Sequence, residues 1–313
     1  MNKKKDIRVH ALVRFASAIT LLNILGYSFL GFENSYAHPF VALLTGYSIE
    51  FFMEFIISKT SNRPAKYTGG IKKVIIFLLP AHITSLAVSM LIFTNENLMG
   101  IIFGVSAALL SKVIFRVTYK GKSKHFLNPS NTGIAISFLV FPWIGSAPPY
   151  QFTEYTTGFY DWLVVAILVS LGTFLNYKFT KKHPLIISWL IAFIVQAVVR
   201  TQIFGTDTIA ALAPMTGLAF LLFTFYMVSD PSTTPFSKRG QIIFGAAVAI
   251  VYGISMELHI VFNLFLSLFI VCTARGLIMM FSDNDWSTDK LVEKHMAEKE
   301  QKQPVLQNEL AVI

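Results

Sequence analysis

Long apolar runs alternate with short polar gaps along most of the chain. A helix that crosses a membrane needs about 20 consecutive, mostly apolar residues. By this criterion the chain has ten candidate spanning segments, at 11–32, 38–58, 72–94, 97–117, 126–145, 159–177, 184–204, 207–228, 240–256 and 258–281. The predicted fold class is an all-α integral membrane protein, a bundle of about ten transmembrane helices.

The gaps between the apolar runs are too short to hold a soluble domain. We therefore expect one polytopic membrane domain over residues 1–281. Residues 282–313 are polar and carry both signs of charge, which predicts a cytoplasmic tail, either a short surface helix or a disordered extension. The last two spans are separated by so few residues, around Glu257 and His259, that their turn must be tight.

Two similar proline-containing polar stretches adjoin apolar runs. Residues 128–133 read Asn-Pro-Ser-Asn-Thr-Gly, and residues 230–235 read Asp-Pro-Ser-Thr-Thr-Pro. Proline cannot donate to a helix ladder and displaces the preceding residue from helical geometry, so a helix should end near Ser229. The backbone that follows must be buried in protein or face water. The two stretches are either a related pair or a chance match.

Two interpretations of these stretches remain open. They can cap helices and turns, with Asn128 or Ser130 at a helix N-terminus and Asp230 in a turn. They can also bind a small molecule, since a helix N-terminus attracts anions and carbonyl oxygens. The density of polar groups beside a membrane favours binding. The candidate binding residues are Asn128, Ser130, Asn131, Thr132, Gly133, Asp230, Ser232, Thr233 and Thr234.

Three further titratable residues lie inside predicted spans. Glu50 and Glu54 are four residues apart and therefore share one helical face. His82 follows Pro80 in the middle of the third span. Intramembrane ionisable groups often mark proton or ion relays. The alternative is that the acids pair with Arg14 or a loop lysine and that the histidine only bonds to a neighbouring helix.

The basic residues lie on one side of a ten-span topology. They occupy the N-terminal segment, the gaps after the second, fourth, sixth and eighth spans, and the tail, whereas the opposite gaps hold acids. The lysines and arginines outside those places are Arg14, Lys112, Arg200 and Arg275. Because cytoplasmic loops are enriched in Lys and Arg, both termini are predicted to be cytoplasmic, in a bacterial inner (plasma) membrane.

Composition supports the same class and excludes others. The chain has 313 residues, of which 54% are hydrophobic and 14% charged, far fewer charges than in soluble domains. Its net charge of +9 follows the topology and does not indicate nucleic-acid binding. The single cysteine, Cys272, excludes a disulfide framework within the chain. We expect no metal site, because no His, Cys or acidic cluster has ligand spacing, and no Walker loop or nucleophile motif is present.

The two proline-containing stretches and their surroundings resemble a known family. Residues 227–235, followed by Lys-Arg-Gly-Gln at 238–241 and Phe-Gly at 244–245, look like the Thr-Asp-Pro-x-Thr…Lys-Gly-x…Gly signature of the NqrB/RnfD family. These are ten-span subunits of membrane electron-transport complexes. The 128–133 stretch resembles the Asn-Pro-Ala-x-x-Gly motif of the same subunits. The resemblance covers roughly residues 70–280 and is nearest to UnbU-like members.

The resemblance implies a bundle of two related five-helix halves, flavin binding and electron transfer across or along the membrane. Family members with covalent FMN attach it to a threonine in an outside-facing Asp-x-x-Ser/Thr-Gly-Ala-Thr sequence. Here the outside loop at 146–158 has Thr-Thr-Gly and lacks Gly-Ala-Thr, and residues 207–213 only echo the motif. We therefore expect no covalent FMN and a noncovalent riboflavin or FMN.

Three functions follow as hypotheses. The leading one is an RnfD/NqrB-like redox subunit that holds a noncovalent flavin and works with redox partner subunits in the lipid bilayer. The second is a transporter or channel for a small molecule or ion on the same fold, without redox chemistry. The third is a scaffold subunit that has lost its chemistry and holds a partner.

Overall fold

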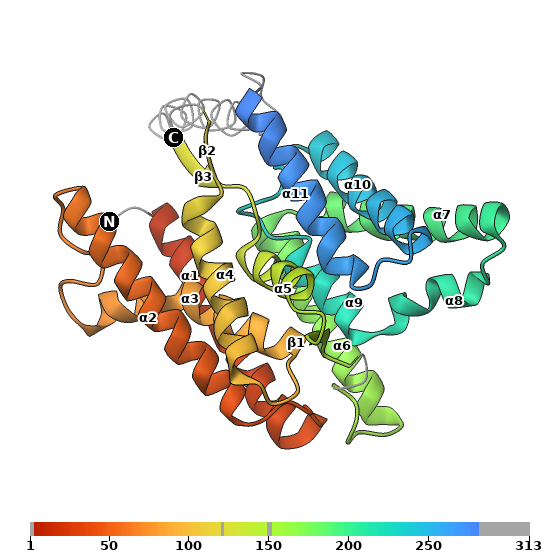
Figure 1. Cartoon of the computed structure of the whole chain (residues 1–313), viewed down its shortest axis with the longest axis horizontal. Helices are drawn as coiled ribbons and strands as arrows, with labels where there is room; N and C mark the ends of the chain where they lie inside the picture. The colour runs from red at the N-terminus through yellow and green to blue at the C-terminus, as the bar shows by residue number, and fades with distance from the viewer. Residues whose placement is uncertain (1–2, 120–121, 149–151, 282–313) are drawn as a thin grey trace, which may run out of the picture.

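The structure is a computed structural model that describes residues 3–119, 122–148 and 152–281. Helices lie side by side in one bundle, with the N-terminal helices at one end of the view in Figure 1 and the C-terminal helices at the other. The predicted tail, 282–313, lies outside the described residues, as does part of the 146–158 loop.

The N-terminal half consists of long helices and two short strand pairs. A π-helical turn, η1, extends the first helix, and β1 pairs with β4 while β2 pairs with β3, both antiparallel. Its elements are α1 (Lys3–Leu25), η1 (Gly26–Leu30), α2 (Ala37–Thr60), α3 (Ile71–Leu91), β1 (Ile92–Phe93), α4 (Leu98–Ile114), β2 (Arg116–Tyr119), β3 (Lys122–His125), α5 (Pro129–Val140) and β4 (Gly145–Ser146).

The C-terminal half is wholly helical within the described residues. Its elements are α6 (Phe159–Phe174), η2 (Leu175–Thr180), α7 (His183–Phe204), α8 (Thr208–Leu212), η3 (Ala213–Thr216), α9 (Leu218–Leu222), η4 (Phe223–Met227), α10 (Lys238–Glu257) and α11 (Asn263–Phe281). The predicted helix end near Ser229 is confirmed, since η4 ends at Met227. The tight last turn is confirmed too: His259 and Phe262 there have positive φ angles of 56° and 64°.

Multi-pass membrane character is supported by helix length and hydropathy. Among the described residues, seven helices are long and apolar enough to cross a membrane, and the bent pair Thr208–Thr216 and Leu218–Met227, at 65°, raises this to as many as eight. The other two predicted spans form shorter helices. Residues 97–117 give a 17-residue α4, and residues 126–145 give a 12-residue α5.

Proline explains why α5 is short. Pro129 occupies its first turn, and Pro142 forces the preceding Phe141 into an extended conformation with ψ 100°. Twelve residues rise about 18 Å, well short of the roughly 30 Å hydrocarbon core. The all-α membrane class therefore holds, while the count of ten spans remains a prediction.

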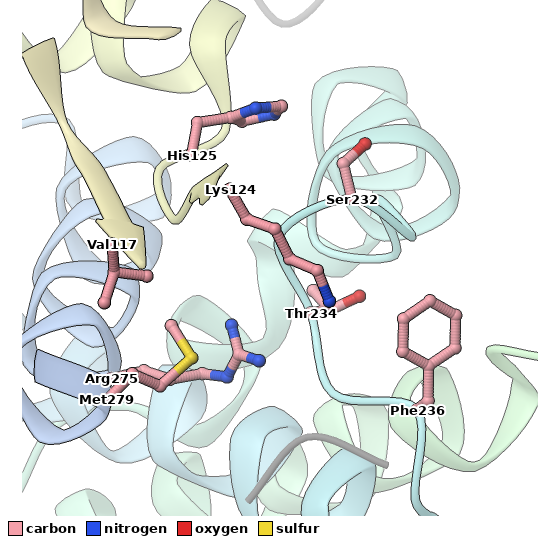
Figure 2. A pocket seen from close by; sticks show the side chains of 8 residues that line it. All are labelled: Val117, Lys124, His125, Ser232, Thr234, Phe236, Arg275 and Met279. Atoms are coloured by element: carbon pink, nitrogen blue, oxygen red, sulfur yellow. The ribbon is translucent and has the colours of Figure 1, made fainter. Parts of the chain in front are cut away.

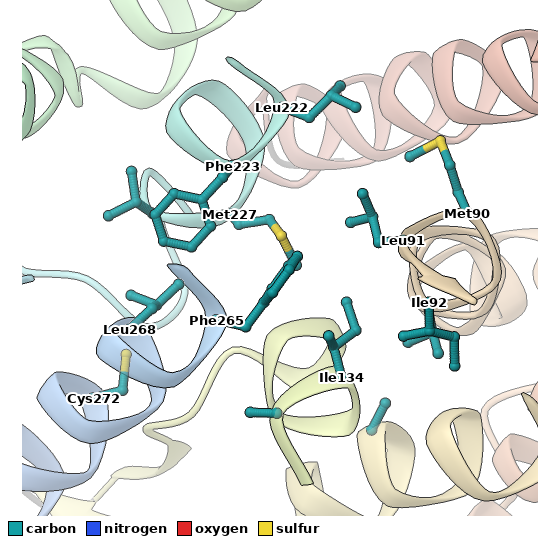
Figure 3. Packing of buried hydrophobic residues seen from close by; sticks show 14 of the residues in the cluster. Met90, Leu91, Ile92, Ile134, Leu222, Phe223, Met227, Phe265, Leu268 and Cys272 are labelled. Carbon is teal, nitrogen blue, oxygen red and sulfur yellow. The ribbon is translucent and has the colours of Figure 1, made fainter. Parts of the chain in front are cut away.

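Close packing between helices depends on small residues, as expected where lipid weakens the hydrophobic drive for helix association. A Cβ built on Gly245 of α10 would lie 2.6 Å from the Leu185 carbonyl oxygen of α7. The two halves meet in an apolar layer, where Met90, Leu91 and Ile92 approach Ile134, Phe223, Met227 and Phe265 (Figure 3).

Replacing Gly133 by alanine is expected to lower stability through this packing. A Cβ there would collide with the Gly104 carbonyl oxygen and lie 2.6 Å from Ala108 Cβ. Overpacking of this kind costs about 1–3 kcal/mol. We expect a lower melting temperature for Gly133→Ala in detergent, measured by circular dichroism.

Gly145→Ala is the matched control, because nothing lies within 4 Å of a Cβ built there. Equal melting temperatures for the two variants would contradict close α4–α5 packing at Gly133.

Candidate functional site

The first proline-containing stretch caps α5. Asn128 Oδ1 accepts hydrogen bonds from the Asn131 backbone nitrogen at 3.1 Å and from Ser130 Oγ at 3.0 Å. Thr132 Oγ1 donates to the Asn128 carbonyl oxygen at 2.7 Å. Gly133 packs against α4. The capping interpretation therefore accounts for Asn128, Ser130 and Thr132.

The second stretch forms a turn around one carboxylate. Asp230 Oδ1 accepts from the Ser232 backbone nitrogen at 3.1 Å and from Ser232 Oγ at 2.9 Å, and Oδ2 accepts from Thr233 Oγ1 at 2.8 Å. Thr234 Oγ1 donates to the Asp230 carbonyl oxygen. The polar groups of the second stretch thus form hydrogen bonds with one another, as the turn interpretation of Asp230 predicts.

The two stretches meet in space, although about 100 residues separate them in the chain. Asn128 Nδ2 donates to the Met227 carbonyl oxygen, just before the second stretch, at 3.3 Å. Asn131 Nδ2 donates to the Phe265 carbonyl oxygen of α11 at 2.9 Å. From the same helix, Arg275 Nη1 donates to the Thr233 carbonyl oxygen at 2.7 Å. Helix α11 thus bridges both stretches.

A buried lysine holds the end of the second stretch. Lys182, between η2 and α7, is fully buried, and its Nζ donates to the Pro235 carbonyl oxygen at 2.7 Å. Nζ also lies 4.4 Å from the centroid of the Phe236 ring. Burial lowers the pKa of Lys182 to about 7; the charge of Asp230 opposes this shift and that of Arg275 adds to it. This amine therefore changes charge near neutral pH.

A pocket opens where the second stretch faces the β2–β3 hairpin and α11 (Figure 2). Its empty volume is about 370 Å³, including space open to solvent. Two cationic side chains, Lys124 and Arg275, line it, and none of its described lining residues is acidic. The full lining is Val117, Lys124, His125, Ser232, Thr234, Phe236, Arg275 and Met279. The combination of positive charge, hydroxyls and apolar groups suits an anionic ligand with a hydrophobic part.

The predicted binding residues divide into two groups. Ser232 and Thr234 line the pocket, whereas Asn128, Asn131 and Thr132 are buried in helix contacts. The structure thus brings all nine candidates into neighbouring segments but exposes only part of the set to the pocket.

The basic residues of the site did not stand out in the sequence. Lys124 and Lys182 belonged there to the general positive charge of the predicted cytoplasmic side, and Arg275 was one of the basic residues outside it. Instead, Arg275 binds the second stretch and Lys182 is enclosed. The one sequence signal for Arg275 was an arginine inside an apolar run.

The two acids of α2 form ion pairs. Glu54 is 3% exposed and accepts from Arg63 Nη1 at 2.5 Å and from the Lys66 backbone nitrogen at 2.8 Å. Glu50 Oε2 lies 3.7 Å from Lys112 Nζ of α4. The pairing alternative therefore accounts for Glu54, with loop residues and not Arg14 as partners.

His82 joins three helices. Its Nε2 lies 2.7 Å from Thr20 Oγ1 of α1, and its Nδ1 lies 2.6 Å from the Tyr47 hydroxyl of α2. Both ring nitrogens thus have a hydroxyl partner, and a neutral ring must donate to one and accept from the other.

The segments compared with the covalent FMN motif make local contacts. Thr156 Oγ1 donates to Asp161, and Asp207 caps α8 by accepting from the Ala210 backbone nitrogen at 2.8 Å. Residues 149–151 of the outside loop lie outside the described part of the chain. The absence of covalent FMN stays a prediction.

The lowered pKa of Lys182 predicts a pH-dependent stability. Its pKa falls from 10.5 to about 7 on folding, so the unfolded chain binds more protons between these values. The free energy of unfolding should therefore rise as the pH is raised from about 7 towards 10.5. In Lys182→Met this rise should be lost, as measured by melting temperature against pH.

The neighbouring Lys181→Met serves as control, because Lys181 is exposed. It should keep the wild-type pH dependence. An unchanged profile in Lys182→Met would mean that Lys182 keeps an ordinary pKa in the folded protein.

No protein-family model matches this chain, and no curated protein matches it either. The function is therefore inferred from the residues and their contacts.

Proposed function

We propose that this protein is a membrane redox subunit, similar to the NqrB/RnfD family, that binds a noncovalent flavin where the two proline-containing stretches meet. Electrons pass through the flavin across or along the membrane to partner subunits. The flavin would supply the redox step, and the protein would supply binding, orientation and electrostatics.

One observation carries the proposal: the two stretches that hold the family-like motifs adjoin each other through Asn128 and Met227. Such convergence of broken backbone from two halves is the usual arrangement of a small-molecule site in membrane proteins. The capping hydrogen bonds within each stretch form without any contribution from the other stretch. The contact is therefore an independent argument for a shared site.

The pocket beside this junction favours a flavin with a phosphate. Arg275 and Lys124 provide positive charge, and the hydroxyl groups of Ser232 and Thr234, which donate to Asp230, add polar lining. Arg275 Nε is buried and has no hydrogen-bond partner among the described residues, so a donor is left for a ligand. Phosphate oxygens accept such charge-assisted hydrogen bonds, so the chemistry of the lining favours FMN over riboflavin.

The same proposal includes the finer topology. Ten spans in two related halves, with both termini in the bacterial cytoplasm, agree with the one-sided distribution of basic residues. In that arrangement α5 and the bent pair α8–α9 are broken or partial spans.

The decisive measurement is the flavin content of the protein purified in detergent. We expect visible flavin absorbance that survives washing and a flavin that denaturation releases intact. The denatured polypeptide should then carry no flavin fluorescence on a gel. A colourless protein without extractable flavin would refute the proposal.

Arg275→Gln should reduce bound FMN about tenfold or more, since a hydrogen bond to a charged group contributes about 1.5–3 kcal/mol. Arg239→Gln, which removes an exposed arginine nearby, is the matched control and should retain flavin. Arg275→Lys should recover part of the binding by restoring the charge. Equal FMN content in all three variants would exclude Arg275 from the site.

A transporter without redox chemistry is the competing function, and the bent helix pair at 65° is the observation that favours it. Uptake of substrate into proteoliposomes that persists after the flavin is stripped would support it.

A further inference from the structure

A continuous line of polar side chains runs between α1 and α3. Thr20, Asn23 and Tyr27 are spaced by three and four residues, so they share one face of α1 and its η1 extension. His82, Ser85 and Ser89 repeat the same spacing on α3. Thr20 bonds to His82, and Tyr27 lies beside Ser89, so the two helices run parallel with their polar faces in register. We call these six residues the polar seam.

The polar seam holds buried atoms that lack partners. Within the described part of the chain, Asn23 Oδ1, the Tyr27 hydroxyl, Ser85 Oγ and Ser89 Oγ have no hydrogen bond in the required geometry. Ser85 and Ser89 are themselves fully buried. Tyr27 and Ser89 lie next to each other, so the buried atoms of the seam without such a neighbour are Asn23 Oδ1 and Ser85 Oγ, one turn closer to His82.

Other helical hydroxyls of this protein behave differently. Thr84, Ser106 and Ser137 donate to the carbonyl oxygen one turn earlier, as hydroxyls in membrane helices usually do. Ser85 and Ser89 do not use this default partner. Ser85 Oγ instead faces Gly46 of α2, where an added Cβ would collide with it. The orientation of these serines is therefore a property of the seam.

Orphaned polar atoms in a membrane interior are costly, each by several kcal/mol in order of magnitude. Water is the partner that can satisfy donors and acceptors arranged in a row. A row of water molecules and hydroxyls can relay protons, whereas a dry seam would carry the full cost of the unpaired groups.

His82 stands at one end of the polar seam, where its Nδ1 contacts the Tyr47 hydroxyl of α2. A proton that reaches one ring nitrogen from the Thr20 side is balanced by release of the proton on the other nitrogen to the Tyr47 side, or the reverse. No electron moves, and the ring resets by rotating so that its two nitrogens exchange positions. Glu50 lies one turn from Tyr47 on α2, and its ion-pair partner is Lys112 of α4.

Both ends of the seam continue in polar residues. Beyond Tyr47, Glu50 and then Glu54 lead to the loop that holds Arg63. Beyond Ser89, Asn34 Nδ2 donates to the Ser89 and Ile92 carbonyl oxygens at 3.3 and 3.1 Å. Next to it, His38 Nε2 lies 3.3 Å from Thr94 Oγ1, and its Nδ1 is buried without a partner among the described residues.

We propose that the polar seam between α1 and α3 is a hydrated proton pathway with His82 as its protonatable relay. The pathway is separate from the pocket at the second proline-containing stretch and does not depend on flavin binding there.

Proton flux through the full-length protein tests this proposal. Proteoliposomes containing a pH-sensitive dye are given a potassium diffusion potential with valinomycin, and the rate of internal acidification is recorded. We expect wild-type protein to exceed protein-free liposomes. His82→Gln, which keeps hydrogen-bonding groups but cannot carry a proton, should lose this excess. The double variant Ser85→Ala/Ser89→Ala should lose most of it.

Ser106→Ala is the matched control, since its hydroxyl already bonds within α4. It should conduct like the wild type, and all variants should show wild-type melting temperatures. Wild-type flux equal to that of protein-free liposomes, or full flux in His82→Gln, would overturn the proposal. Acidification that requires sodium in the buffer would overturn it as well.

Hydration can be measured without any variant. Hydroxyl radicals generated by X-rays from internal water oxidise side chains beside that water, so Tyr27 and Met90 should be modified in the intact protein. Trp189 and Phe193, fully buried in α7, provide the dry reference. Protection of Tyr27 and Met90 equal to that of Trp189 would show a dry seam and refute the proposal.

Discussion

Backbone polar groups inside a membrane need partners within the protein, and this constraint organises the C-terminal half. The prolines of 230–235 interrupt the helical ladder and leave carbonyl oxygens exposed. The protein satisfies them with side chains from distant segments: Lys182 donates to Pro235, and Arg275 donates to Thr233. Asn128 does the same for Met227. The broken segment is thus held by donors from three other parts of the chain.

These donors give the site its charge. Carbonyl oxygens are acceptors, so their partners must be donors; of the three, Arg275 is cationic and Lys182 is charged below about pH 7. Asp230 is occupied by its own turn and compensates only part of this charge. The region therefore remains positive beside an open pocket, an arrangement suited to an anionic ligand. The same polar groups can stabilise helix ends and line a binding site. The capping and binding interpretations of these stretches are therefore compatible.

The N-terminal half meets the same constraint differently. In α2, Glu54 is enclosed with Arg63 and the Lys66 backbone. Along α1 and α3 the polar groups form a line whose members are only partly paired. One half thus binds its exposed backbone groups tightly, and the other leaves some buried side-chain atoms without a protein partner among the described residues. This division separates a proposed ligand site from a proposed proton path.

The membrane class, the helix end near Ser229 and the tight turn before α11 were determined by the sequence alone. Each depends on local properties: apolar run length, proline geometry and the residues available for a turn. The shortness of α5 also has a local cause, since Pro129 and Pro142 limit the helix. The apolar run 126–145 extends past both prolines and therefore predicted a longer span. Only the tertiary structure decided that Lys182 is enclosed, that Arg275 reaches Thr233 and that Asn128 meets Met227. A side chain's partner depends on which helices become neighbours, and that choice is made by packing across the whole bundle.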